Sequence, residues 1–182
     1  MVSARPAVQA LPAYKPGRNP ADVAREIGVE RAVKLASNEV AFPPLPAVVQ
    51  ALATAAAETN RYPDNGAVAL TAALAERYGV APEQVATGCG AVTLCQELAQ
   101  AYNDPGTSLA FAWRSFEMYP LLAQVAGARP VMVPLTPGRP GGPADTHDLE
   151  ALAAAVDEST RLVFVCNPNN PTGTSGSVTN SR

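Results

Sequence analysis

An asparagine- and proline-rich segment, Asn167-Pro-Asn-Asn-Pro-Thr-Gly173, follows directly after an apolar run at residues 162–166. A short apolar run of this kind is typical of a buried strand, and ligands of parallel α/β sheets bind beyond the carboxyl ends of strands. Prolines make the segment rigid, and the NH2 group of an asparagine can donate to a phenolate-like oxygen. The segment therefore predicts a ligand-binding loop, and the alternative is a plain asparagine–proline turn.

A glycine turn, Thr87-Gly-Cys-Gly-Ala-Val92, leads from a predicted short strand at 85–88 into a predicted helix. Glycine lets the backbone approach a ligand closely, and the free N–H groups at a helix start bind phosphate. This turn is a candidate phosphate site, although the same letters also suit an ordinary strand-to-helix turn.

Two aromatic segments complete the candidate chemistry. Trp113-Arg-Ser-Phe-Glu-Met-Tyr119 follows a predicted strand at 108–112, and a ring at a strand end can stack on a flat heterocycle. Phe116 is the candidate for that stacking, with a place in the core as the alternative, whereas Tyr119 is expected in the core. Asn60-Arg-Tyr-Pro-Asp64 is predicted to be a loop, since proline, asparagine and glycine break its periodicity.

Alternating strands and helices must position these residues. The apolar periodicity predicts strands at 85–88, 108–112, 129–134 and 162–166, and helices at 91–102, 116–126 and 148–156. This alternation implies right-handed crossovers and an α/β fold with a mainly parallel sheet and flanking helices. Further helices are predicted at 21–27, from Pro46, and through Leu70 to Tyr78, with a glycine- and proline-rich loop at 136–144.

Composition excludes several classes of protein. The chain has 182 residues, enough for one core, and a net charge of −3 without a basic cluster, so nucleic acid is not an expected partner. No apolar run approaches the roughly 20 residues that span a bilayer. The three cysteines lack CxxC spacing, which argues against zinc or any other metal site and favours a reducing cytoplasm. The single histidine, His147, is expected at the surface or as a helix cap.

These motifs together resemble the fold-type I aminotransferases that use pyridoxal 5'-phosphate (PLP), in the histidinol-phosphate and aromatic aminotransferase branch. The heptapeptide at 167–173 is similar to the family's Asn-Pro-x-Asn-Pro-Thr-Gly signature. Leu35-Ala-Ser-Asn-Glu39 and Tyr14-Lys-Pro-Gly17 are similar to the branch's amino-terminal segments. The resemblance runs over about residues 10–174 and over about the front half of the family's length.

The resemblance implies a set of site residues. Those assigned to PLP are Gly90, Ala91, Val92, Phe116, Asn170 and, reaching to a neighbouring subunit, Tyr62. The backbone amides of Ala91 and Val92 would bind the phosphate, with Gly90 giving room, and Val92 stands where many relatives have an acidic residue. Tyr14 and Asn38 are weaker candidates for substrate binding. The Asn170–Pro171 bond is expected to be cis.

The resemblance also implies an activity and a limit to it. Relatives are homodimers that move an amino group between an amino acid, here histidinol phosphate or an aromatic amino acid, and a 2-oxo acid. Their Schiff-base lysine would lie beyond Arg182, and Lys15 and Lys34, the only lysines, precede the sheet. No catalytic residue is therefore expected in this truncated chain. The alternatives are a non-catalytic fragment or another fold-type I PLP enzyme, such as an amino-acid-phosphate decarboxylase.

The expected domain organisation follows from the same resemblance. Residues 1–34 are expected to form an amino-terminal arm belonging to a small domain, and residues 35–174 part of a PLP-binding large domain. Residues 175–182 are polar and aperiodic, so a disordered tail is expected there.

Overall fold

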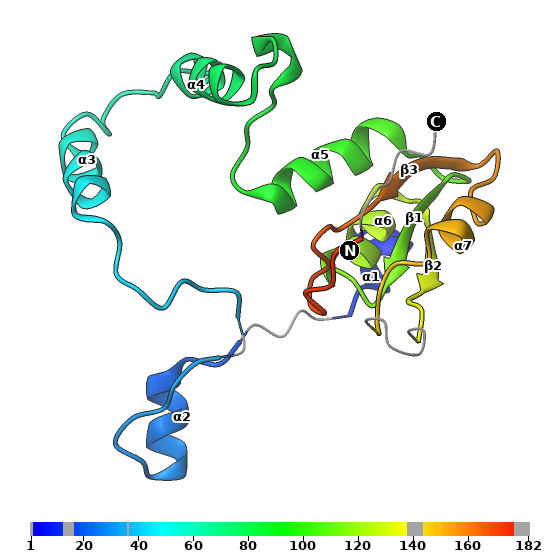
Figure 1. The fold of residues 1–182 in the computed structure, drawn as a ribbon, viewed down its shortest axis with the longest axis horizontal. Helices are drawn as coiled ribbons and strands as arrows, with labels where there is room; N and C mark the ends of the chain where they lie inside the picture. The colour runs from blue at the N-terminus through cyan, green and yellow to red at the C-terminus, as the bar shows by residue number, and fades with distance from the viewer. Residues whose placement is uncertain (1, 13–16, 36, 138–143, 177–182) are drawn as a thin grey trace. The chain divides into compact units, whose positions relative to one another are not determined.

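The structure, a computed structural model, describes residues 2–12, 17–35, 37–137 and 144–176 (Figure 1). The chain divides into two compact units, one formed by Met1–Leu11 with Ala86–Arg182 and the other by Pro12–Val85. Most of the loop predicted at 136–144 and most of the tail predicted at 175–182 lie outside the described residues, as do Tyr14 and Lys15. The domain boundary placed after residue 34 stays a prediction.

A three-stranded parallel sheet is the centre of the first unit. Its strands are β1 (Ser108–Trp113), β2 (Arg129–Pro134) and β3 (Thr160–Phe164), in the order β2-β1-β3. In the register, Phe111 of β1 lies beside Met132 of β2 and Phe164 of β3. The predicted α/β fold with a parallel sheet is confirmed, and so are three of its four predicted strands.

The prediction of a strand at 85–88 is wrong. This segment forms no ladder in the described structure and follows a short 3-10 helix, η1 (Pro82–Gln84). A strand exists only when a neighbour accepts and donates its backbone hydrogen bonds. The sheet order β2-β1-β3 offers no described strand beside 85–88, and a local apolar pattern cannot supply one.

Helices cover both faces of the sheet, as the apolar run Leu109–Trp113 of β1 requires. On one face, Leu109 and Phe111 pack with residues of α5 (Ala91–Tyr102) and α6 (Met118–Ala126). On the other, Ala110 packs with Leu152 of α7 (Leu149–Ala154), which Asp148 caps by accepting a hydrogen bond from the Ala151 amide. Figure 1 shows α6 and α7 on opposite sides of the sheet.

The amino-terminal residues add a short helix, α1 (Pro6–Gln9), to the first unit. The Arg5 guanidinium donates a hydrogen bond of 2.5 Å to the carbonyl oxygen of Val125 at the end of α6. The sequence contains no signal for α1, since four residues are too few to show a helical period.

The second unit contains three α-helices in its described part, besides η1: α2 (Pro20–Ile27), α3 (Pro46–Ala56) and α4 (Val68–Tyr78). Local signals set their bounds. Proline opens α2 and α3, and Gly28 and Gly79 end α2 and α4 in the left-handed conformation. No helix in the described part of the chain is long and apolar enough to cross a membrane.

Candidate functional site

The segments that follow β1 and β3 emerge at the same edge of the sheet, because the strands are parallel. A side-chain hydrogen bond joins them: the Ser115 hydroxyl donates to Oδ1 of Asn169 over 2.8 Å. Both residues are buried, at 4% and 2% exposure. At the carboxyl edge, the loops after β1 and β3 are thus joined by a contact between residues 54 positions apart in the sequence.

The amide of Asn169 is fully engaged at this edge. Its Nδ2 donates to the carbonyl oxygen of Arg114 at 3.0 Å and to Oγ1 of Thr172 at 2.9 Å. Its backbone N–H donates to the Thr174 carbonyl, and its own carbonyl accepts from the Gly173 amide. Asn169 is missing from the sequence-based site, because nothing local distinguishes it from Asn167 and Asn170.

Two threonines connect this loop to the segment before α7. The hydroxyls of Thr172 and Thr174 both donate to the carbonyl oxygen of Asp145, over 3.2 and 2.8 Å. Asp145 has a φ of 58°, a left-handed conformation that aspartate tolerates better than most residues. The loop after β3 is therefore held from two sides, by Arg114 and Ser115 on one and by Asp145 on the other.

Asn170 differs from its neighbour in that its side chain has no hydrogen-bond partner among the residues that the structure describes, although it is half-buried. Asn167, in contrast, exchanges a pair of hydrogen bonds with the backbone of Gly176. The Asn170–Pro171 bond is cis, which confirms the prediction, and the Asn167–Pro168 bond is cis as well. Of the three asparagines in the loop, Asn170 is the one whose side chain has no described partner.

Phe116 lies half-buried at the same edge, directly after Ser115. Its ring meets that of Tyr119 edge to face, with centroids 5.5 Å apart and planes at 87°. Tyr119 is a core residue as predicted, and burial raises the pKa of its hydroxyl, to which the neighbouring Cys166 thiol adds. Phe116 thus packs against the core through its contact with Tyr119.

The glycine turn leads into α5, which begins at Ala91. Gly90 has φ 87° and ψ 164°, and a Cβ there would meet nothing within 4 Å. Glycine is therefore favoured by the backbone conformation itself, and its role in giving a phosphate room stays a prediction. The N–H groups of Ala91 and Val92 belong to the first turn of the helix. Backbone N–H groups in a first turn have no acceptor within the helix.

The start of α5 is placed at the carboxyl edge by topology. The helix ends at Tyr102, and β1 begins at Ser108, so α5 runs back along the sheet in the opposite direction to β1. Cys95, one turn into α5, packs against the same core cluster as Phe116 and Cys166. The structure thus brings the glycine turn, Phe116 and the 167–173 loop to one edge, and their convergence on a single ligand stays a prediction.

The remaining predicted residues lie elsewhere. Asn38 and Tyr62 belong to the second unit, and both are exposed. Tyr62 is completely exposed, in a loop held by Asp64, whose carboxylate accepts from the amides of Val68 and Gly66 at 2.6 and 3.0 Å. These hydrogen bonds lower the pKa of Asp64. The roles of Asn38 and Tyr62 stay predictions, as does that of Tyr14.

Two cations of the second unit beside a cavity are paired. Arg18 and Lys34 line a cavity of about 280 Å³ between α2 and residues 32–35, and they form ion pairs with Glu26 and Glu39. This neutralisation leaves the cavity without a charge for an anion.

Of the two expectations for His147, a surface position or a helix cap, the cap is wrong, because Asp148 caps α7, and the residue itself is half-buried. Its Nε2 is buried, and no partner for this atom is found in the described part of the chain. No cluster of three or more metal-ligating side chains occurs among the described residues.

Comparison with known proteins gives a consistent result. Residues 30–178 match the family described as Aminotransferase class I and II. The chain is 56% identical over 168 residues to an aromatic amino acid aminotransferase of Rhodococcus jostii (strain RHA1), covering 92% of this chain and 42% of that protein. It is 54% identical over 171 residues to that of Thermobifida fusca (strain YX), covering 93% and 44%.

Solved structures agree with these relatives. A histidinol-phosphate aminotransferase from Sinorhizobium meliloti, in complex with pyridoxal-5'-phosphate, superposes with a TM-score of 0.77 at 29% identity, covering 94% of this chain and 44% of that one. An aspartate aminotransferase mutant of Thermus thermophilus gives a TM-score of 0.77 at 28% identity, covering 96% and 47%. The chain spans a little under half the length of the proteins it matches. Because residues 30–178 match this family and the chain has the parallel α/β fold expected of its members, the chain belongs to the aminotransferase class I and II family.

Proposed function

We propose that this chain provides the PLP-binding edge of an aminotransferase for aromatic amino acids. The observation that carries the proposal is the amide of Asn170, which has no partner among the described residues and is held at the carboxyl edge of the sheet by its fully bonded neighbour Asn169. A free donor on a firmly held loop can bind a ligand oxygen without a large loss of side-chain entropy.

The donor set suits a phosphorylated pyridine ring. The first-turn amides of α5, at Ala91 and Val92, point a helix N-terminus at an anion, which favours phosphate. The Phe116 ring can cover one face of a flat heterocycle, and the Asn170 NH2 can donate to its phenolic oxygen. PLP, when bound, supplies an electron sink for reactions at the carbon that carries the amino group.

The chain's own residues bind and orient the cofactor in this proposal. Phe116 would shield one face of the cofactor ring from water, and its packing against the core holds it in place. None of the described residues of this unit is a lysine, and Lys34 pairs with Glu39 in the other unit. We therefore assign no catalytic proton transfer to this chain.

Tyr62 is proposed to act on a second copy. It stands fully exposed on a loop that Asp64 fixes at the start of α4. A tyrosine presented in this way can donate its hydroxyl to a phosphate bound in a partner subunit. A homodimer follows from this proposal. The three unpaired cysteines agree with a reducing compartment such as the cytoplasm.

The substrate follows from the relatives. The aromatic amino acid aminotransferases that the chain matches are 49% to 56% identical to it, which favours an aromatic amino acid and a 2-oxo acid. Histidinol phosphate is the second candidate, because a structure similar to the chain belongs to a histidinol-phosphate aminotransferase. All these relatives are named as aminotransferases, which favours amino-group transfer over decarboxylation.

The first experiment measures binding of PLP to the purified chain by its absorbance and by quenching of Trp113 fluorescence. Asn170→Ala is expected to weaken binding about tenfold, the equivalent of a lost hydrogen bond to a charged group, with little change in Tm. Asn19→Ala, which removes an exposed cap of α2, is the control. Equal affinity for pyridoxal without its phosphate, or an unchanged affinity in Asn170→Ala, would contradict the proposal.

The second experiment concerns substrate and chemistry. Phosphopyridoxyl-phenylalanine should bind more tightly than phosphopyridoxyl-histidinol phosphate if the substrate is aromatic, and the reverse order supports the second candidate. Borohydride reduction of the chain with PLP should leave no stoichiometric adduct. An adduct on Lys15 or Lys34, together with turnover of an amino acid, would show that the chain does carry its own catalytic lysine.

A further inference from the structure

We propose that Ser115 and Asn169 are positioning residues that couple the two sides of the PLP site. Ser115 immediately precedes Phe116, and Asn169 immediately precedes Asn170. The hydrogen bond between Ser115 and Asn169 therefore ties the residue proposed to cover the ring to the residue proposed to bind its phenolic oxygen. This inference rests on the proposed function and deepens it.

Backbone hydrogen bonds between β1 and β3 do not hold these two residues together. The register between β1 and β3 ends at Phe111 and Phe164, well before Phe116 and Asn170. Beyond that pair, Phe116 and Cys166 pack against a common core cluster, and the described hydrogen bonds between the loops after β1 and β3 are those of the Asn169 amide, with the Ser115 hydroxyl and with the Arg114 carbonyl. The directional contacts that relate Phe116 to Asn170 thus involve one buried side chain.

Asparagine is the side chain that meets the requirements of this position. Its Oδ1 accepts from Ser115, and its Nδ2 donates to the Arg114 carbonyl and the Thr172 hydroxyl, so one acceptor and two donors are used. Aspartate would set a carboxylate oxygen against the Arg114 carbonyl, since a carboxylate has no donor. The surroundings of Asn169 therefore select an amide, while those of Asn170 leave an amide free.

The test compares two buried serines of β1 and its following loop. Ser115→Ala removes the coupling hydrogen bond, while Ser108→Ala removes a buried hydroxyl bonded to Thr160 at the opposite edge of the sheet. We expect Ser115→Ala to weaken PLP binding about fivefold, the equivalent of one hydrogen bond, and Ser108→Ala to leave it within about twofold. Equal losses of affinity in the two variants would overturn the proposal and indicate a general loss of stability.

A second pair of variants guards against unfolding of Ser115→Ala. Thr172 is half-buried and accepts from Asn169. Thr172→Val removes the acceptor, whereas Thr172→Ser keeps the hydroxyl and loses a methyl group. We expect Thr172→Val to weaken PLP binding about threefold or more and Thr172→Ser to restore it. Failure of Thr172→Ser to recover affinity would contradict a role through the hydrogen bond.

Hydrogen exchange separates this proposal from the proposed function. The amides of Asn169 and Gly173 are bonded within the loop, so Ser115→Ala should speed their exchange several-fold, while the amides of β1 stay protected. This readout needs no PLP. If exchange is faster in Ser115→Ala but the chain does not bind PLP, the proposed coupling is supported and the proposed PLP site is rejected. Unchanged exchange at both amides would reject the coupling.

Discussion

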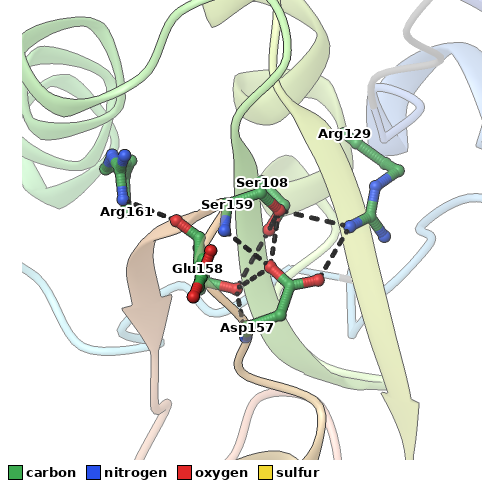
Figure 2. Close-up of polar contacts among 7 residues, drawn as sticks. Ser108, Arg129, Asp157, Glu158, Ser159 and Arg161 are labelled. Carbon is green, nitrogen blue, oxygen red and sulfur yellow. Dashed lines mark hydrogen bonds and ion pairs between the residues drawn. The ribbon is translucent and has the colours of Figure 1, made fainter.

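The two edges of the sheet in the first unit both carry a network of serine and threonine hydroxyls, and they use it differently. At the amino edge, Ser108 Oγ lies 3.1 Å from Thr160 Oγ1 and 3.2 Å from Ser159 Oγ. At the carboxyl edge, the Ser115 hydroxyl bonds to the buried amide of Asn169. Figure 2 shows the amino-edge group, in which Asp157 and Ser159 meet the start of β1.

The amino edge is closed on itself. Asp157 Oδ1 accepts from the amide and the hydroxyl of Ser159, at 2.8 and 2.6 Å, and its other oxygen faces Arg129 at 3.5 Å. The Arg129–Asp157 pair is more than half exposed on both sides, so it contributes little to stability. All the described donors to the Asp157 carboxylate belong to residues of this network. The outer side of the network is exposed to solvent.

The network at the carboxyl edge bonds to the backbone of two other loops. Asn169 and the threonines donate to the carbonyls of Arg114 and Asp145, which fixes the path of these loops, while the neighbouring Asn170 amide has no partner among the described residues. The comparison teaches that a network whose bonds stay among residues at the strand starts holds strands together. A network that fixes two loops and leaves a neighbouring amide without a described partner suits the ligand site proposed above.

The largest effect is expected from the core that both edges share. Phe111 is fully buried beneath them, and Phe111→Ala should cost about 3–5 kcal/mol of unfolding free energy through lost packing and a cavity. Urea unfolding followed by circular dichroism measures it. Met132→Ala, in an exposed part of β2, is the control and should cost about 1 kcal/mol or less. Similar losses in the two variants would mean that the core does not support both edges as described.

A smaller effect should separate the edges. Asn169→Ala leaves the buried Ser115 hydroxyl and the Arg114 carbonyl without partners, so we expect a loss of about 1–3 kcal/mol in unfolding free energy. Ser159→Ala removes a half-exposed hydroxyl that water can replace, and about 0.5 kcal/mol is expected. Urea midpoints of both variants give the comparison. A greater loss of unfolding free energy in Ser159→Ala than in Asn169→Ala would contradict the view that the carboxyl-edge network is the more buried and costly one to break.

The smallest effect is a dependence on pH at the amino edge alone. The hydroxyl and then the amide of Ser159 lower the pKa of Asp157 from its ordinary value of 3.8. The carboxylate form is thus favoured by folding, so its stabilisation is complete above about pH 3.8 and is lost as the pH falls through the lower pKa of the folded state.

Asp157→Asn should flatten the fall in the urea midpoint between about pH 5 and pH 3. Ser115→Ala should keep this fall, because no member of the Ser115–Asn169 contact titrates. An equally steep fall in Asp157→Asn would show that the carboxylate of Asp157 does not contribute.

Several parts of the protein were determined by local sequence alone. The bounds of α5 and β2 follow from apolar periodicity and from the residues that stop it, and the glycine turn and the 167–173 loop were readable because conformation and motif are local properties. Capping by Gly79 is of the same kind. Each of these depends on contacts between residues that are neighbours in the chain, which a single sequence displays directly.

Tertiary structure alone decided which of three similar asparagines is bonded and which is free. Asn167, Asn169 and Asn170 occupy the same loop, and their different roles arise from Gly176, from Ser115 and Arg114, and from the lack of a described partner, respectively. The failed strand at 85–88 has the same cause, since strand formation requires a partner that local pattern cannot provide. Hydrogen bonds between distant segments depend on how the elements pack. The sequence of one segment therefore does not indicate which residues of the other segment it will contact.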